Sequence, residues 1–312
     1  MTGKRKLVHL TALFLLPLIV AAFGISTAGA LGLVVLMLLW RWGISLSTWV
    51  APAKTPELEL RTISASHFVE KVRWCMDRLG VDYTETPCGG TLNAFYLGQS
   101  VPLLRFRTGG VRSSIGNSAE ILRYLWGRYS VEMEDGAMFL EPTPERLALE
   151  AKNDRCGADL QVWIYYHLLD HRELTLHAWG VDEPRIPAWQ RLALKLVYPL
   201  QAALIRRAFR ISERQHRNAV GRLEKLMGEV EELLADGRGS ILGGDEPNFS
   251  DFTYASIMGL WLQPGTYGGG RAENVKVARA DLPEPMQHEI ESWSERFPRN
   301  VALIEKLYSD FR

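Results

Sequence analysis

Two serines and a histidine stand where an alternating segment gives way to a helical pattern. The stretch "SASHFVEKVRW" runs from Ser64 to Trp74 and places Ser64, Ser66 and His67 directly before apolar residues with helical spacing. A helix N-terminus presents unpaired N–H groups and about half a positive charge, so it stabilises anions. A thiol is useful as the thiolate, and its ordinary pKa is about 8.5. A hydroxyl that donates to the sulfur lowers this pKa further, so the stretch suits a thiolate-holding site. The alternative is that Ser66 only caps the helix.

The elements around this stretch alternate between strand and helix. Leu58–Ser64 alternates in polarity like a strand, and Phe68–Leu79 carries a helical apolar stripe that Gly80 ends. Val81–Pro87 alternates again, so a strand–helix–strand unit is expected, which favours parallel pairing. A strand hairpin and a helix follow. Their expected ranges are Leu103–Arg107, Val111–Ile115 and Asn117–Tyr129.

The sequence after Pro144 shows helical spacing throughout and no convincing strand. We therefore predict an α/β domain of βαβ–ββα order over 58–130 and an all-helical bundle domain over 145–312. Within the second domain, Asn248 and Asp251 are spaced as a capping box, which is a folding signal without chemistry of its own.

The N-terminus is not typical of a globular domain. From Leu7 onward, no Asp, Glu, Lys or Arg occurs before Arg41. This run exceeds the roughly 20 residues of a single membrane span, and glycines with small residues interrupt it at 24–29. We therefore predict that residues 1–50 form a membrane anchor, a transmembrane hairpin with arms at Leu7–Phe23 and Ala30–Val50.

The predicted anchor implies an orientation and a partner. Basic residues flank both outer ends of the hairpin, which predicts that both ends and the downstream domains lie on the cytoplasmic side. The membrane would be a bacterial-type inner membrane or another cellular membrane. The lipid bilayer is then a partner. The proline-rich residues 51–57 are expected to be a linker. A single anchor and a cleaved signal peptide ending near Ala28-Gly29-Ala30 remain alternatives.

The bulk composition excludes several classes of function. The chain has 36 basic and 36 acidic side chains, and a nucleic-acid partner usually requires a basic excess. Its three cysteines are odd in number and widely spaced, which argues against a disulfide framework and for a reducing compartment. No Cys/His spacing typical of a metal site occurs, so no metal is expected.

Three segments in this order resemble the cytosolic glutathione S-transferase superfamily. "SASHFVEKVRWCMDRLGVDY" is similar to its first strand–helix, and "SVPLL" with "SSIGNSAEILRYL" is similar to its cis-proline strand and following helix. "GGDEPNFSDFTYAS" is similar to the capping box of its helical domain. The resemblance covers roughly 58–312. It implies a thioredoxin-like glutathione-binding domain over 58–130, a helical C-terminal domain, and glutathione as co-substrate.

The resemblance assigns roles to the opening stretch. Counting back from Lys71-Val72-Arg73, Ser66 falls on the family's catalytic Ser/Cys position, and Ser64 is the fallback hydroxyl. His67 stands where the family often has proline. A histidine there either donates to the thiolate or the substrate, or it faces solvent in the loop.

The resemblance also implies a glutathione-binding set. Pro102 matches the cis-proline, which would expose the backbone of Val101 to the peptide-like backbone of glutathione. Ser118, with helix N–H groups, would hold the γ-glutamyl carboxylate. Asn117 stands where the family usually has an acidic residue, so it lacks the charge that would pair with the glutathione ammonium. Tyr166 lies on a helix that borders the family's electrophile pocket.

The expected function is a membrane-anchored glutathione transferase-like enzyme in which a stabilised thiolate attacks an unknown electrophile. The alternative from another class is a non-catalytic scaffold of the same fold that binds partners at the membrane. A glutathione-dependent reductase or isomerase would share the site and stays open. Members of the superfamily are usually dimers, so a homodimer is an expectation that a membrane tether would modify.

Overall fold

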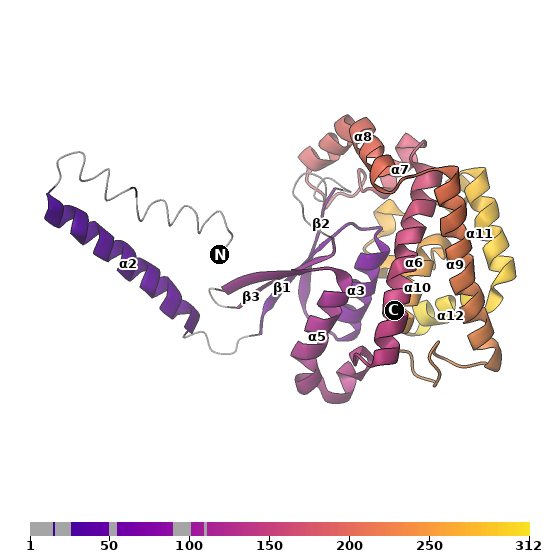
Figure 1. Cartoon of the computed structure of the whole chain (residues 1–312), viewed down its shortest axis with the longest axis horizontal. Helices are drawn as coiled ribbons and strands as arrows, with labels where there is room; N and C mark the ends of the chain where they lie inside the picture. The colour runs from indigo at the N-terminus through magenta and orange to yellow at the C-terminus, as the bar shows by residue number, and fades with distance from the viewer. Residues whose placement is uncertain (1–14, 16–25, 50–54, 90–100, 109–110) are drawn as a thin grey trace. The chain divides into compact units, whose positions relative to one another are not determined.

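A computed structural model describes residues 15, 26–49, 55–89, 101–108 and 111–312 of the chain (Figure 1). The chain divides into two compact units. The first joins Met1–Glu59 with Arg105–Ser114, and the second joins Leu60–Leu104 with Ile115–Arg312.

Four strands form one sheet in the order β2-β1-β3-β4. Their bounds are Glu57–Thr62 for β1, Tyr83–Pro87 for β2, Leu103–Thr108 for β3 and Val111–Gly116 for β4. The predicted order is confirmed, because α3 (His67–Arg78) connects β1 to β2 and α5 (Ser118–Met133) follows β4. Leu58, Leu60 and Thr62 of β1 are buried in alternation, as the polarity of the sequence indicates. Pro102 lies directly before β3 rather than inside it.

Helix α3 is unusual because it buries charge as well as apolar surface. Lys71 is fully buried and its Nζ lies 2.7 Å from Glu150 and 2.9 Å from Asp154, both on α6 (Pro144–Leu168). Burial raises the pKa of the Asp154 carboxyl, although the Lys71 ammonium acts in the opposite direction. Each of these ion pairs joins α3 to the helical part of the chain.

Every described element after β4 is helical, as predicted. Helix α6 packs against α9 and α10, and α10 packs against α3 (Figure 1). The Asn248 side chain accepts from the Ser250 N–H at 2.9 Å and Asp251 accepts from the Asn248 N–H at 2.9 Å, which confirms the capping box of α10. The bounds are Arg172–Ala178 for α7, Ala188–Ala208 for α8, Glu213–Leu233 for α9, Phe249–Leu262 for α10, Glu284–Arg296 for α11 and Pro298–Asp310 for α12.

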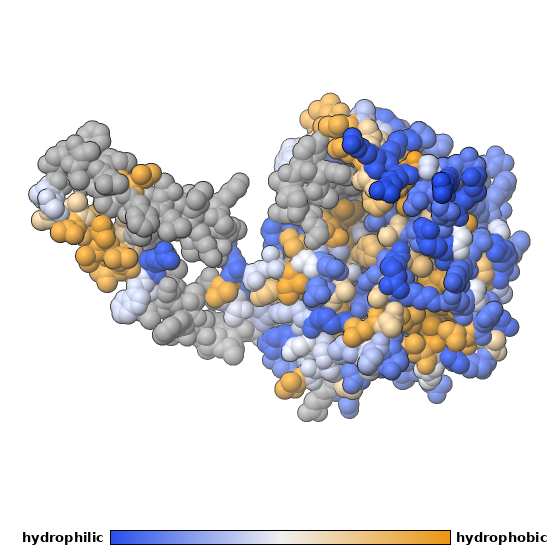
Figure 2. Space-filling model, viewed as in Figure 1, coloured by the Kyte–Doolittle hydropathy of each residue, from blue (hydrophilic) through white to orange (hydrophobic). Residues whose placement is uncertain are grey.

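The N-terminal prediction is only partly met. Helix α2 spans Thr27–Trp49, so the second predicted arm is helical, and it exposes Leu31, Leu36 and Leu39 (Figure 2). The first arm lies outside the described residues except for Leu15. Among the helices that the structure describes, none is both long and apolar enough to span a membrane. The transmembrane hairpin and the lipid partner are therefore not supported.

Candidate active site at the start of α3

Helix α3 begins beside a cavity of about 150 Å³ that lies within the second compact unit. Ser66 and His67 line it from the start of α3, and mostly apolar side chains, many of them on α6, α7 and α10, line the remainder together with Gln161, Thr175 and Gln263. The residues that these helices and the loop before α11 contribute include Ile164, Tyr165, Leu168, Trp179, Leu260 and Leu282. A concave, largely apolar space with a hydroxyl and an imidazole at one side is the usual form of a small-molecule site.

Ser66 occupies the N-cap position without capping through its side chain. Its N–H donates to Ile63 O at 2.9 Å, and its carbonyl accepts from Glu70 N–H at 2.9 Å. Its hydroxyl makes no capping hydrogen bond to α3. The side-chain hydrogen bond expected of a capping serine is therefore absent at Ser66. Ser64 is buried and its Oγ has no hydrogen-bond partner among the described residues, but it does not line the cavity.

His67 does not face solvent, which corrects one of the two readings from the sequence. It is the first residue of α3 and is 2% exposed. Burial lowers the pKa of its imidazole to about 3, against a hydrogen bond with Gly157 that raises it, and the Lys71 ammonium lowers it further. The imidazole is therefore neutral at physiological pH and adds no positive charge beside Ser66.

Gly157 on α6 allows His67 to be buried in this way. A Cβ at Gly157 would lie 2.8 Å from Cζ of Phe68 and 3.0 Å from Nε2 of His67. Both distances are shorter than ordinary contacts, so only glycine lets α6 approach the first turn of α3 this closely. No local pattern around His67 indicates this approach, because the glycine lies in a different helix.

Among the predicted glutathione-binding residues, the proline has the cis bond that the resemblance implies. The Val101–Pro102 peptide bond is cis. Asn117 has φ of 68°, and its Oδ1 accepts from the Ala119 N–H at 3.1 Å, so it caps α5. Ser118 is buried at the first position of α5. None of these four residues lines the cavity beside Ser66, so the structure does not bring all the predicted site residues into one space.

The three cysteines are all buried. Burial raises the pKa of Cys75 to about 12 and that of Cys156 to about 11. Cys88 donates its thiol to Thr62 O at 3.0 Å. Cys75 and Cys156 therefore stay protonated at neutral pH, and none of the three thiols lines the cavity, so a reacting sulfur there must come from a ligand.

The sequence analysis singled out the wrong tyrosine of α6. Tyr165, rather than Tyr166, lines it, and burial raises the pKa of Tyr165 to about 12, so its phenol stays protonated. Tyr166 instead stacks on His216, with ring centroids 4.0 Å apart. Adjacent aromatic residues on one helix carry no signal of which of them faces a cavity, because the phase depends on the neighbouring helices.

No protein-family model matches the sequence, and neither does any curated protein sequence. Several solved structures are similar in fold. A glutathione S-transferase from Methylobacterium radiotolerans JCM 2831, in complex with glutathione sulfonate, is 15% identical over 81% of this chain and 91% of its own, with a TM-score of 0.48. A theta class enzyme from Xanthomonas axonopodis pv. citri, with glutathione bound, is 19% identical over 80% of this chain and 98% of its own, with a TM-score of 0.36. A maleylacetoacetate isomerase from Anaeromyxobacter dehalogenans 2CP-1 is 16% identical over 83% of this chain and 96% of its own, with a TM-score of 0.37.

Proposed function

We propose that this chain binds glutathione beside the start of α3 and stabilises its thiolate for attack on an apolar electrophile. The observation that carries the proposal is Ser66, a residue that lines the cavity and whose hydroxyl makes no capping hydrogen bond to α3. A hydroxyl in this position is available to donate to an anion. The positive end of a 12-residue helix acts on the same anion.

The lining of the cavity indicates where the nucleophile comes from. The cavity is lined by no cysteine, so a bound thiol would be the nucleophile and the protein would lower its pKa. The thiol proton passes to solvent, and the sulfur forms a bond to the electrophilic carbon. In a substitution the leaving group departs with the electrons of its broken bond. In an addition the π electrons shift to the neighbouring atom, which takes up a proton from solvent. The apolar walls formed by Ile164, Leu168 and Trp179 favour an apolar electrophile.

In this proposal the rest of glutathione extends from Ser66 toward Val101 and Ser118. The backbone of Val101, beside the cis bond, would pair with the peptide-like backbone of glutathione. Ser118 and the N–H groups at the start of α5 would hold the γ-glutamyl carboxylate. His67 would contribute a neutral imidazole, so it serves as a hydrogen-bond partner rather than as a charge.

The test is the pKa of bound glutathione, measured from the ultraviolet absorbance of its thiolate. In the wild type we expect this pKa to fall below the free value of about 8.5. Ser66→Ala removes a hydrogen bond to a charged group, worth roughly 1.5–3 kcal/mol, so the pKa should rise by about one to two units. Ser114→Ala, an exposed serine of β4, is the matched control. If the pKa of bound glutathione rises in Ser64→Ala and not in Ser66→Ala, Ser64 is the residue that stabilises the thiolate.

A second candidate function is a non-catalytic scaffold of the same fold. Asn117 favours it, because its neutral side chain caps α5 and offers no charge to the ammonium of glutathione. Capture on immobilised glutathione separates the two candidates. Retention that weakens in Ser118→Ala supports the enzyme, whereas no retention and no conjugation of a general electrophile support the scaffold.

A further inference from the structure

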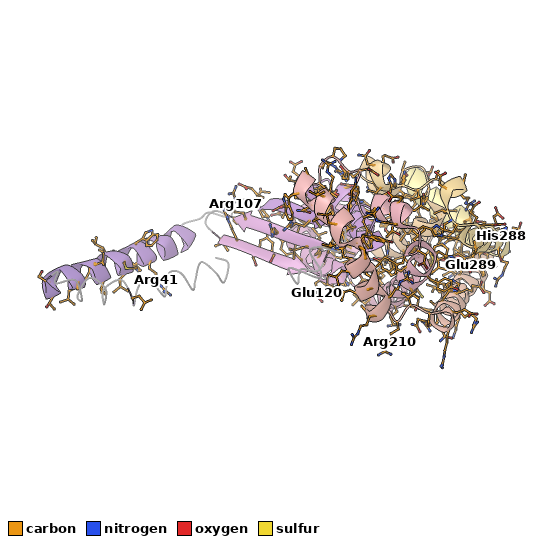
Figure 3. All side chains as sticks on the ribbon, turned by 90° about the horizontal axis from the view of Figure 1, so that it is seen from above. Arg41, Arg107, Glu120, Arg210, His288 and Glu289 are labelled. Carbon is orange, nitrogen blue, oxygen red and sulfur yellow. The ribbon has the colours of Figure 1, made fainter. Side chains whose placement is uncertain are left out.

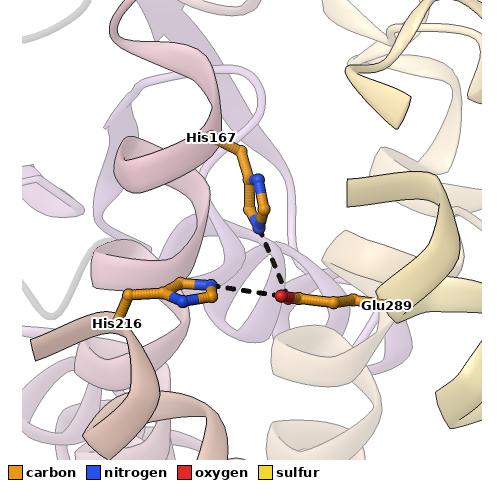
Figure 4. A group of neighbouring side chains, drawn as sticks. All are labelled: His167, His216 and Glu289. Carbon is orange, nitrogen blue, oxygen red and sulfur yellow. Dashed lines mark hydrogen bonds and ion pairs between the residues drawn. The ribbon is translucent and has the colours of Figure 1, made fainter. Parts of the chain in front are cut away.

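Two histidines and a glutamate meet where three helices of the second unit pack together (Figure 4). His167 lies near the end of α6, His216 in the first turn of α9, and Glu289 in α11. The two histidines are buried and Glu289 is partly exposed, so the group is open to solvent from the carboxylate side. One nitrogen or oxygen from each residue lies within 4.8 Å of the others.

The distances within this group are long for hydrogen bonds. His167 Nε2 lies 3.3 Å from Glu289 Oε2, and His216 Nε2 lies 3.4 Å from Glu289 Oε1. The usual N–H···O separation is about 2.9–3.0 Å. Ligands placed about 2.05 Å from a tetrahedral zinc ion are separated by about 3.3–3.4 Å, twice that radius times the sine of half the tetrahedral angle. The two nitrogen–oxygen separations match those between ligands of one ion, and the three ligand atoms, which lie within 4.8 Å of one another, would draw closer together on binding it.

One ligand atom has a long ion-pair contact but no hydrogen bond. Nε2 of His216 is buried and makes no hydrogen bond in the described structure, although it lies within ion-pair distance of Glu289. An unpaired nitrogen inside a protein has lost its hydration without compensation, which costs free energy unless something binds it. A bound cation would supply the missing interaction.

The surrounding aromatic residues hold the three side chains in place. The His216 ring stacks on Tyr166 with an interplanar angle of 19°, and the His167 ring meets it edge-on, with centroids 5.0 Å apart. The indole N–H of Trp163 donates to Oε2 of Glu289. Ligands of a metal are usually oriented by outer hydrogen bonds of this kind.

We propose that His167, His216 and Glu289 bind a divalent cation of the Zn²⁺ type, with solvent as the fourth ligand. Two imidazoles and one carboxylate are a common donor set for zinc, and they leave one coordination position open. The expectation from sequence spacing that the chain has no metal site is thereby revised. The site is separate from the proposed thiolate site, because none of its three ligands lines the cavity beside Ser66.

The experiment titrates the untagged full-length chain, first treated with chelator, with Co²⁺ and then with Zn²⁺. We expect one equivalent of Co²⁺ to give the visible absorption of a tetrahedral site, and Zn²⁺ to displace it. His216→Phe keeps a ring to stack on Tyr166 and removes the nitrogen ligand, whereas Glu289→Gln keeps an acceptor for Trp163 and removes the charge. Each should weaken Co²⁺ binding at least tenfold.

His288→Ala is the matched control, because His288 is exposed and adjacent to Glu289 on α11 (Figure 3). It should bind Co²⁺ like the wild type. Circular dichroism confirms that each variant is folded. Absence of stoichiometric binding to the wild type would overturn the proposal whatever the variants do. Binding by folded His216→Phe and Glu289→Gln at wild-type strength would overturn it as well, and would leave the group as an ion-pair network.

Discussion

At the start of α3, the imidazole of His67 is neutral because burial outweighs the interactions that would favour its charge. The sequence allowed either a donor or a solvent-facing residue at this position. Nothing in the local residues decides between them, because burial comes from α6, about ninety positions later in the chain. The start of α5 beside Asn117 was predictable because its capping signal is local, whereas the cis bond before Pro102 was expected only from the family resemblance.

Buried His67 makes stability depend on pH. Its pKa is about 3 when folded and about 6.5 when unfolded, so the unfolded chain binds an extra proton between these values. This contribution to stability is complete above pH 6.5 and falls by about 1.4 kcal/mol per pH unit as the pH drops toward 3. Urea unfolding at pH 7, 6 and 5 measures it. His67→Gln should show a shallower loss than the wild type, and equal slopes would show that His67 is not buried neutral.

Elements were predicted well where the pattern lies within one segment. The alternation in β1 and the helical stripe of α3 gave both elements to within two residues. The buried charges of α3 were beyond such patterns. Lys71 reads as a solvated residue of an amphipathic helix, yet it is buried because Asp154, 83 positions away, pairs with it.

The close approach of α6 to α3 can be tested with two glycines. Gly157→Ala should destabilise the protein by about 1–3 kcal/mol, because the added methyl group overpacks against His67 and Phe68. Gly221 on α9 has nothing within 4 Å of the same position. Gly221→Ala should therefore stabilise by about 0.5–1 kcal/mol through helix propensity. The melting temperature of each variant, measured by thermal unfolding, gives the sign of its stability change. A higher melting temperature for both variants would show that α6 moves away from α3 at little cost.

At the scale of the whole molecule, residues distant in sequence complete the surroundings of α3. Arg312 donates to Glu70 at 2.8 Å and to Asp77 at 2.7 Å, and it is nearly as buried as its partner Glu70. The indole N–H of Trp74 donates to Phe311 O at 2.9 Å. The same holds for the cluster of His167 and Glu289, which are 122 positions apart. Spacing along the sequence cannot reveal such groups, because only the packing of helices creates them.

Arg312→Ala tests this connection. Removing one member of a buried ion pair costs roughly 3–5 kcal/mol of unfolding free energy. We expect a loss within or below that range for Arg312→Ala, because Glu70 still pairs with Arg73 at 3.0 Å. Arg217 and Glu213 form an exposed pair on α9, so Arg217→Ala should cost at most about 0.5 kcal/mol. The midpoint of urea denaturation measures both. Equal midpoints for the two variants would contradict the inferred role of Arg312.

The link between Glu70 and Arg312 bears on biosynthesis, since these partners are separated by 242 positions. A ribosome adds roughly 5–20 residues per second, so the carboxylate emerges about 12–48 s before its guanidinium exists. During that interval, nascent α3 lacks the Arg312 guanidinium that pairs with Glu70 in the complete chain. A gene fragment that ends after β4 never encodes Arg312, so Glu70 stays without this partner. We expect its product to depend on chaperones.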